Sequence, residues 1–122
     1  MKISIHQPNL FPWVGYFEKI NYSDIFMFLD DSLVHKKNLD LLNRSSFIIN
    51  NKKKFFSIPI KRNFLIKNIS EIEIDDPISW KIKFINSLNE NYKKKLFFDE
   101  VMYLVKDILS FDSYLMAEFN IN

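Results

Sequence analysis

Residues 3–31 constrain the fold more than any other part of the chain, because strand-like and helix-like patterns follow one another there. Ile3 and Ile5 share one face of a two-residue period, which predicts a strand over residues 2–6. An uninterrupted apolar run predicts a second strand over residues 25–30. Such a run is typical of a strand that is covered on both faces.

The residues between these two strands predict an amphipathic helix that begins near Pro12. Proline is favoured in the first helical turn, where its missing N–H would have no partner. Apolar residues then recur at the helical spacing i, i+3, i+4 and i+7, and they are Trp13, Tyr16, Phe17 and Ile20. The predicted unit is therefore strand, helix, strand, and its right-handed crossover makes the two strands parallel.

Polar side chains follow both predicted strands at the edge where an open α/β sheet binds ligands. His6 and Gln7 end the first strand, and Asp30 and Asp31 end the second. The free N–H groups at the start of the helix favour an anion at this edge. We therefore expect these four residues and Asn9 to share one rim. The open alternative is that His6 and Asn9 cap the turn and that the two aspartates are solvated loop residues.

Beyond residue 31 the pattern predicts an α/β fold that continues with a β-hairpin and ends in helices. The polar residues 35–38 are expected to form a loop, residues 46–61 the hairpin and residues 70–74 a further strand. Three helices are then expected, over residues 77–92, over residues 98–109, and after a cap at Asp112. The apolar face of the first is expected along Ile78, Ile82, Ile85 and Tyr92, with Trp80, Phe84 and Leu88 flanking it. That of the second is expected along Val101, Leu104, Val105 and Ile108.

Composition excludes several classes of site. The single glycine excludes a Gly-rich phosphate loop, and the absence of cysteine excludes a thiol nucleophile and a Cys-based zinc site. Two histidines are too few for a His-based metal cage, so no metal site is predicted, although a His-plus-carboxylate site stays open. The net charge of +2 does not favour a nucleic-acid partner. The sequence shows no long apolar run and no signal peptide, so we expect a cytoplasmic protein without membrane insertion. The sequence contains no motif that indicates a particular cofactor, so the cofactor stays unknown.

The opening segment IHQPNLFPWVGYFEKI, followed by DIFMFLDD, resembles the signature of the WbqC-like family. The likeness continues through Asn43-Arg44, the strand Phe55–Ile60, Trp80, and residues 91–94 and 97–100, and so covers nearly the whole chain. Members of the family are associated with gene clusters for bacterial O-antigen, a part of lipopolysaccharide, and for other surface polysaccharides. The resemblance therefore implies a role in polysaccharide biosynthesis.

This chain departs from the family pattern in two respects. Leu42-Asn43-Arg44-Ser45 stands where the family has Gln-Asn-Arg-Asn, so two polar side chains are altered. Family members are also close to twice this length. Residues 1–122 are therefore expected to be a single α/β domain that forms the N-terminal part of a longer family domain, as in a truncated member.

The resemblance implies two alternative functions. The first is acyl or aminoacyl transfer to a nucleotide-linked amino sugar, with His6 as general base and Asp30 or Asp31 as its catalytic partner. The second is a non-catalytic binding or scaffold module, or a truncated inactive member. In either case the expected partner is a nucleotide-linked sugar or another small anionic ligand. The substrate-binding candidates are Gln7, Asn9, Trp13, Tyr16, Lys37, Asn43 and Arg44.

The layout of the opening unit also resembles nucleotidylyltransferase-like α/β domains, which implies a three-layer architecture. Those enzymes carry a His-x-Gly-His motif at the start of the first helix. Trp13-Val14-Gly15-Tyr16 occupies that place here, and both histidines are absent.

The last two predicted helices carry apolar residues on more than one face. We expect an exposed apolar patch within residues 102–119, covered by a second copy or a partner chain. Its main members are expected to be Leu109, Phe111, Leu115, Met116 and Phe119.

Overall fold

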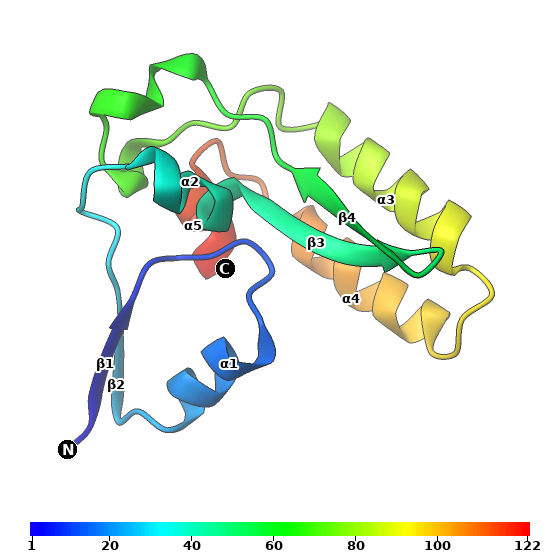
Figure 1. The fold of residues 1–122 in the computed structure, drawn as a ribbon, viewed down its shortest axis with the longest axis horizontal. Coiled ribbons are helices and arrows are strands. Elements are labelled where there is room, and N and C mark those ends of the chain that lie inside the picture. Colours follow the sequence, from blue (N-terminus) through cyan, green and yellow to red (C-terminus); the bar gives the residue numbers. More distant parts are fainter.

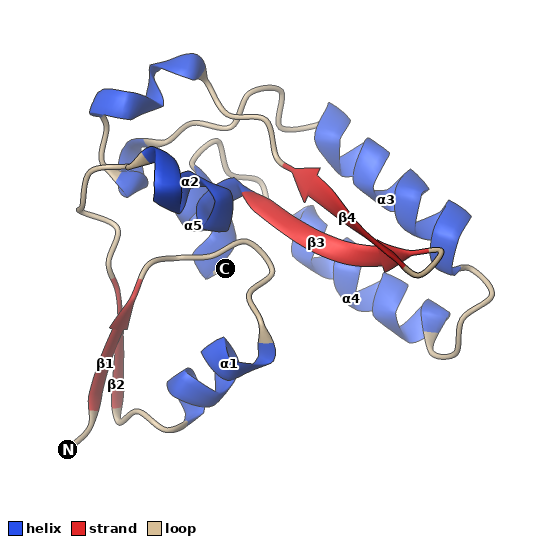
Figure 2. Cartoon of the chain, in the orientation of Figure 1, coloured by secondary structure: helices blue, strands red, loops and turns tan.

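A computed structural model describes the backbone of residues 1–122 and every side chain except those of residues 36–38 and 65. The chain is a mixed α/β fold with an N-terminal βαβ unit, a β-hairpin and C-terminal helices, as predicted (Figures 1 and 2). The elements in chain order are β1 (Ile3–His6), α1 (Val14–Asn21), β2 (Ile25–Phe28), α2 (Lys36–Asn43), β3 (Arg44–Ile49), β4 (Lys52–Ser57), α3 (Ser79–Tyr92), α4 (Phe98–Ser110) and α5 (Met116–Ile121). Two short 3-10 turns, Arg62–Ile66 and Ile69–Glu71, connect the hairpin to α3.

The predicted parallel pairing of the first two strands is confirmed. β1 and β2 pair in parallel, with Ile3 opposite Ile25 and His6 opposite Phe28. The helix between them begins at Val14, two residues later than Pro12. The strands form two separate two-stranded sheets, β1–β2 and β3–β4. The predicted three-layer nucleotidylyltransferase-like architecture is therefore not confirmed.

Only one face of the β1–β2 sheet is covered, so the prediction of a strand buried on both faces is wrong. The rings of Tyr16 and Phe26 lie 5.6 Å apart, which places α1 on one face (Figure 1). The other face carries exposed apolar side chains because no helix lies on it, and they are Ile3, Ile5, Ile25, Met27 and Leu29. Within the predicted apolar stripe of α1, Tyr16 is buried, but Trp13 and Phe17 are more than half exposed.

The predicted hairpin is confirmed, with different strand ends. β3 and β4 are antiparallel and turn at Asn50 and Asn51, whose φ angles of 50° and 59° suit a tight type I′ turn. The segment expected as a loop instead enters α2, which leads directly into β3. Residues 70–74 do not form a strand, because residues 70 and 71 lie in the 3-10 turn Ile69–Glu71. Isolated bridges then pair Ile74 with Ile60 and Glu73 with Leu115.

The core lies between the inner face of the hairpin and the helices α3 and α5. Phe56 packs on Phe84 with ring centres 4.6 Å apart, and Trp80 packs edge-on against Phe119 at 5.2 Å. The centre of the predicted stripe of α3 is therefore wrong, because the flanking residues Trp80 and Phe84 turn into the core, whereas Ile85 of the stripe packs against it. Ile82, expected in the core, is 55% exposed.

The predicted face of α4 is wrong in three of its four members, while Val105 packs against the core as predicted. Met102 and Leu109 are buried, whereas Val101, Leu104 and Ile108 are exposed. The start of α5 differs too, since its N-cap is Leu115 and not Asp112, whose carboxylate pairs instead with Lys81 at 3.1 Å. No helix in the described chain is long and apolar enough to cross a bilayer.

The expected apolar patch within residues 102–119 is wrong in its main members. Leu109, Met116 and Phe119 are each 5% exposed or less, and Phe111 and Leu115 are partly buried. The reason is that α5 folds back into the centre, where the backbone N–H of Met116 donates to the carbonyl oxygen of Ile72 at 2.8 Å. A second copy or a partner chain stays a prediction, because nothing in the single chain tests it.

Candidate functional site

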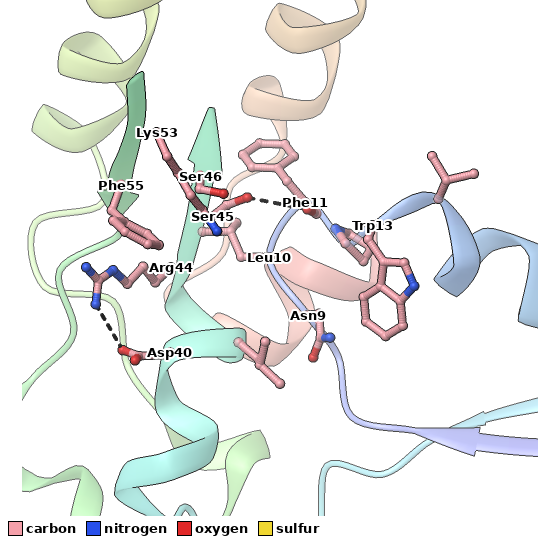
Figure 3. Close-up of a pocket in the computed structure, with 13 residues that line it drawn as sticks. Asn9, Leu10, Phe11, Trp13, Asp40, Arg44, Ser45, Ser46, Lys53 and Phe55 are labelled. Carbon is pink, nitrogen blue, oxygen red and sulfur yellow. Dashed lines mark hydrogen bonds and ion pairs between the residues drawn. The ribbon is translucent and has the colours of Figure 1, made fainter. Parts of the chain in front are cut away.

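A cavity of about 550 Å³ lies between the loop before α1 and the outer face of the hairpin (Figure 3). Its volume is within the range of about 300–1,000 Å³ that is usual for small-molecule sites. Its walls combine aromatic rings, cationic groups and hydroxyls. The lining residues are Asn9, Leu10, Phe11, Pro12, Trp13, Val14, Asp40, Leu41, Arg44, Ser45, Ser46, Lys53 and Phe55.

The hairpin register builds one wall of this cavity. Ser46 pairs with Phe55, and Arg44 and Lys53 lie at even spacing from that pair, so all four side chains share the outer face. The guanidinium of Arg44 lies 4.0 Å from the centre of the Phe55 ring. The ammonium of Lys53 lies 5.2 Å from the same ring. Two cations therefore flank one half-exposed aromatic ring.

Arg44 is only partly satisfied by its neighbours. Its Nη1 lies 3.5 Å from Oδ1 of Asp40, which is a long contact between exposed groups and contributes little to stability. Its Nε is buried and has no hydrogen-bond partner among the described residues. Because an arginine offers five N–H donors in a planar fork, Arg44 keeps donors for an anion in the cavity.

The loop before α1 forms the opposite wall, and Figure 3 shows Asn9 and Trp13 across from Arg44 and Phe55. Asn9 is 4% exposed, and its Oδ1 has no partner among the described residues. Trp13 is 57% exposed, so an indole face is open to a ligand. Ser45 Oγ donates to the carbonyl oxygen of Phe11 at 3.4 Å and ties the two walls together.

His6 lies beside this cavity and does not line it. Its ring contacts Trp13 at 5.8 Å and Tyr16 at 4.8 Å between centres. His6 Nδ1 lies 3.0 Å from the carbonyl oxygen of Gln7, which also accepts a hydrogen bond from the Tyr16 hydroxyl at 2.9 Å. Burial raises the pKa of the Tyr16 hydroxyl, against a lowering by the Asn9 backbone N–H, so Tyr16 stays a donor at neutral pH.

The remaining predicted site residues lie elsewhere. Asp30 is partly buried and Asp31 is exposed, and neither lines the cavity or contacts His6 through a described hydrogen bond. Asn43 donates from Nδ2 to the carbonyl oxygen of Ile58 at 2.8 Å, where α2 meets β3. The side chain of Lys37 lies outside the described residues. The roles proposed for these residues stay predictions.

Within the described part of the chain, no three His, Cys, Asp or Glu side chains gather in a way that would hold a metal ion. The side chains of the cavity walls have the chemistry that suits an anion carrying a flat ring. Arg44 and Lys53 supply charge, and the rings of Trp13 and Phe55 supply stacking surfaces.

The sequence reasoning missed Asp40, Ser46, Lys53 and Phe55 as wall residues. The signal that reveals three of them is the alternation of the hairpin, once its turn is placed at Asn50-Asn51. That turn puts Ser46, Lys53 and Phe55 on the same face as Arg44.

The fold and the cavity define the chain as a mixed α/β protein with a cationic, aromatic-walled cavity. A model of the WbqC-like protein family matches residues 7–122, and the chain belongs to this family. Comparisons with curated proteins and with solved structures found no match.

Proposed function

We propose that this WbqC-like protein binds a nucleotide-linked sugar in the cavity between the loop before α1 and the hairpin. The observation that carries the proposal is the pair of cations, Arg44 and Lys53, on either side of the Phe55 ring and across from Trp13. A nucleotide-linked sugar has the matching parts, since it joins phosphates to a flat base and to a polar sugar.

The phosphates would lie against the hairpin wall. Arg44 holds its guanidinium on the Phe55 ring, so its orientation is set before a ligand arrives, and the one described contact of its terminal nitrogens is the long one from Nη1 to Asp40. Pre-organised arginine donors bind phosphate oxygens in pairs with short, charge-assisted hydrogen bonds. Lys53 adds a second positive charge, and the Ser46 hydroxyl adds a neutral donor on the same face.

The base would stack on Trp13, and the sugar would lie toward Asn9. Trp13 is the more exposed of the two tryptophans, because Trp80 is only 2% exposed in the core. The unpartnered Oδ1 of Asn9 is an acceptor suited to a sugar hydroxyl or amine. Loss of one such partner from a buried polar group costs about 1–3 kcal/mol, so a matching ligand gains specificity.

We infer that the pathway is bacterial O-antigen or other surface-polysaccharide biosynthesis and that the protein works in the cytoplasm. Membership of the WbqC-like family supports this proposal, through the association of similar proteins with polysaccharide gene clusters. A nucleotide-linked sugar is the kind of activated substrate that such a pathway consumes.

Catalysis is the second candidate, and the hydrogen bond of His6 favours it. A carbonyl oxygen can only accept, so His6 Nδ1 carries the proton in its contact with Gln7 and leaves Nε2 as a base. In acyl or aminoacyl transfer, the sugar amine would attack an activated acyl carbon while Nε2 takes its proton and the donor's leaving group departs. Trp13 contacts the His6 ring and also lines the cavity, so it connects the two.

A thermal-shift panel tests the proposed ligand class. The panel holds a uridine-diphosphate amino sugar, uridine, inorganic diphosphate and the free sugar. We expect the intact nucleotide sugar to stabilise the chain most, because a ligand at about 100 times its Kd adds about 2.7 kcal/mol of stability. Arg44→Gln should remove the response to diphosphate, and Trp13→Ala the response to uridine.

The matched control is Lys94→Gln, which removes one exposed positive charge outside the cavity and should leave every response unchanged. Equal shifts with the nucleotide sugar and with every fragment, or no loss in Arg44→Gln, would contradict binding in this cavity. His6→Gln separates the two candidates, because it should keep ligand binding and lose transfer if His6 is the base.

A further inference from the structure

The turn between α3 and α4 carries two exposed apolar side chains, which directly follow a run of lysines in the sequence. Leu96 is 82% exposed and Phe97 is 63% exposed. They follow three exposed lysines, Lys93, Lys94 and Lys95. A Leu or Phe side chain left in water forgoes the free energy of burial, so an adjacent exposed pair favours an interaction surface.

The backbone at this turn is unusual. Phe97 has a φ of 61°, in the left-handed region that residues other than glycine enter at a steric cost. The turn contains no glycine, so the cost falls on an aromatic residue. Strain of this kind persists where a particular side-chain placement is required.

A second group of lysines lies at the same end of the molecule. Lys52 and Lys54 stand at the hairpin tip, beside the α3–α4 turn in Figure 1. The hydroxyl of Tyr92 at the end of α3 donates to the carbonyl oxygen of Ile48 in β3, which fixes the two parts together. Within the described part of the chain, none of these five lysines forms an ion pair.

The charge at this end is positive, because five lysines outnumber the three carboxylates of Glu90, Asp99 and Glu100. Asp99 and Glu100 occupy the first turn of α4, where they complement the helix dipole. Lys53 is not counted among the five, since it lines the ligand cavity.

An apolar hollow of about 150 Å³ lies directly beside the exposed pair. Leu88, Phe97, Val101 and Met102 contribute to its walls, and Tyr92 and Lys95 stand at its margin. Lys95 in the wall of this apolar hollow, with Lys93 and Lys94 next to it in the chain, matches the chemistry of a phospholipid, which has an anionic head above a hydrocarbon chain.

We propose that the α3–α4 turn and the hairpin tip form a peripheral docking surface for a bilayer that contains anionic lipids. Leu96 and Phe97 enter the boundary between headgroups and acyl chains, while the five lysines face the headgroup phosphates. An RNA strand would use the lysines and leave Leu96 in water, so a bilayer is the occupant that the side chains fit. The proposal does not depend on the ligand cavity.

Co-sedimentation of the full chain with vesicles tests the surface. We expect binding to phosphatidylglycerol mixed with phosphatidylcholine, weak binding to phosphatidylcholine alone, and loss of binding at high salt. Each lysine near an anionic bilayer is worth about fivefold in affinity, so Lys93→Gln with Lys95→Gln should weaken binding by about 25-fold. Leu96→Ser with Phe97→Ser should weaken it by tenfold or more.

The controls lie in the 3-10 turn Arg62–Ile66, which is far from this end in Figure 1. Ile66→Ser removes an apolar side chain that is 84% exposed, and Arg62→Gln removes an exposed positive charge. Both should bind vesicles like the unaltered chain. Failure of the unaltered chain to bind anionic vesicles overturns the proposal. So does a lysine variant that loses binding while the Leu96 and Phe97 variant retains it, because that result indicates a site for any polyanion.

Discussion

The guanidinium of Arg44 rests on the face of the Phe55 ring, 4.0 Å from its centre, and the register of the hairpin holds both on the cavity wall. A cation over an aromatic face gains about 0.5–1 kcal/mol at an exposed site. The stacking also fixes the direction of the fork before a ligand binds. This arrangement makes the planar shape of Arg44 important as well as its charge.

Arg44→Lys therefore keeps the charge and loses the fork. We expect the affinity for a nucleoside diphosphate to fall about tenfold, which corresponds to about 1.4 kcal/mol. Asp40→Asn should act in the opposite direction, because it removes the carboxylate that lies 3.5 Å from Nη1 of Arg44. Isothermal titration calorimetry measures both. Equal affinities for the unaltered chain and Arg44→Lys would show that the fork does not contact the phosphate.

Gly15→Ala tests the position of Trp13 without removing the indole. A Cβ at Gly15 would lie 2.5 Å from Nε1 of Trp13, and the indole is the group that must move, since it is 57% exposed. We expect ligand affinity to fall severalfold. Stability should stay equal or rise by up to about 1 kcal/mol, because alanine is the better helix former.

The same ligand titration and a urea denaturation curve measure both effects of Gly15→Ala. Asn21→Ala is the control, because Asn21 is exposed on the same helix and does not line the cavity. Unchanged affinity in Gly15→Ala would mean that the position of Trp13 does not matter for the ligand.

Protonation of Glu73 should account for part of the stability that the fold loses at low pH. Hydrogen bonds from Lys61 and from Lys67, at 2.5 and 2.8 Å, lower the pKa of the Glu73 carboxyl to about 2 from an ordinary value of 4.5. A lowered pKa in the folded state stabilises the fold above the ordinary value, and that contribution is lost as the pH falls from about 4.5 to about 2.

Urea denaturation curves across this pH window measure the effect. In Glu73→Gln, the free energy of unfolding should depend less on pH within this window, and added salt should change it little. Glu90→Gln is the control, since Glu90 is an exposed carboxylate of α3 outside this cluster. An unchanged pH profile in Glu73→Gln would show that the two lysines do not hold the carboxylate in solution.

Phe84 and Ile82 test which face of α3 enters the core. Phe84 is 5% exposed between Phe47 and Phe56, so Phe84→Ala should cost about 3–5 kcal/mol of unfolding free energy. Ile82 is 55% exposed, so Ile82→Ala should change it by only about 0.5 kcal/mol. Denaturant titration compares the two. A larger loss of unfolding free energy in Ile82→Ala than in Phe84→Ala would show that the opposite face of α3 packs in the core.

The local parts of the fold could be predicted because single residues determine them. Asn50 and Asn51 accept the positive φ angles of the hairpin turn. Asp76 accepts hydrogen bonds from the backbone N–H and the hydroxyl of Ser79, the first residue of α3, which begins close to the predicted residue 77. The strand–helix–strand order followed from periodicity alone.

The inward face of α3 could not be predicted in this way, because both of its faces are apolar. Ile82 is an apolar residue on the exposed side of the helix, and Trp80 and Phe84 are apolar residues on its buried side. The choice depends on the aromatic side chains of the hairpin, which offer flat rings to pack against at long sequence separation. The helical periodicity of α3 alone does not show which of its faces packs against these distant aromatic residues.

The candidate site shows the same division. Asn9, Trp13 and Arg44 were named as ligand-binding residues from the sequence, and all three line one cavity, although their binding role is still a prediction. Lys53 and Phe55 join them only through the hairpin register. His6 was expected at the same rim, but it packs behind Trp13 through ring contacts that the sequence spacing does not reveal.

Tryptophan fluorescence offers the most direct test of ligand binding in the cavity. The chain has two tryptophans, and Trp13 is 57% exposed in the cavity wall whereas Trp80 is 2% exposed in the core. Titration with a uridine-diphosphate sugar should therefore quench the long-wavelength emission of Trp13 and leave that of Trp80 unchanged. The quenching should vanish in Trp13→Phe and weaken in Arg44→Gln. An unchanged spectrum at saturating ligand, or quenching that persists in Trp13→Phe, would contradict binding at this site.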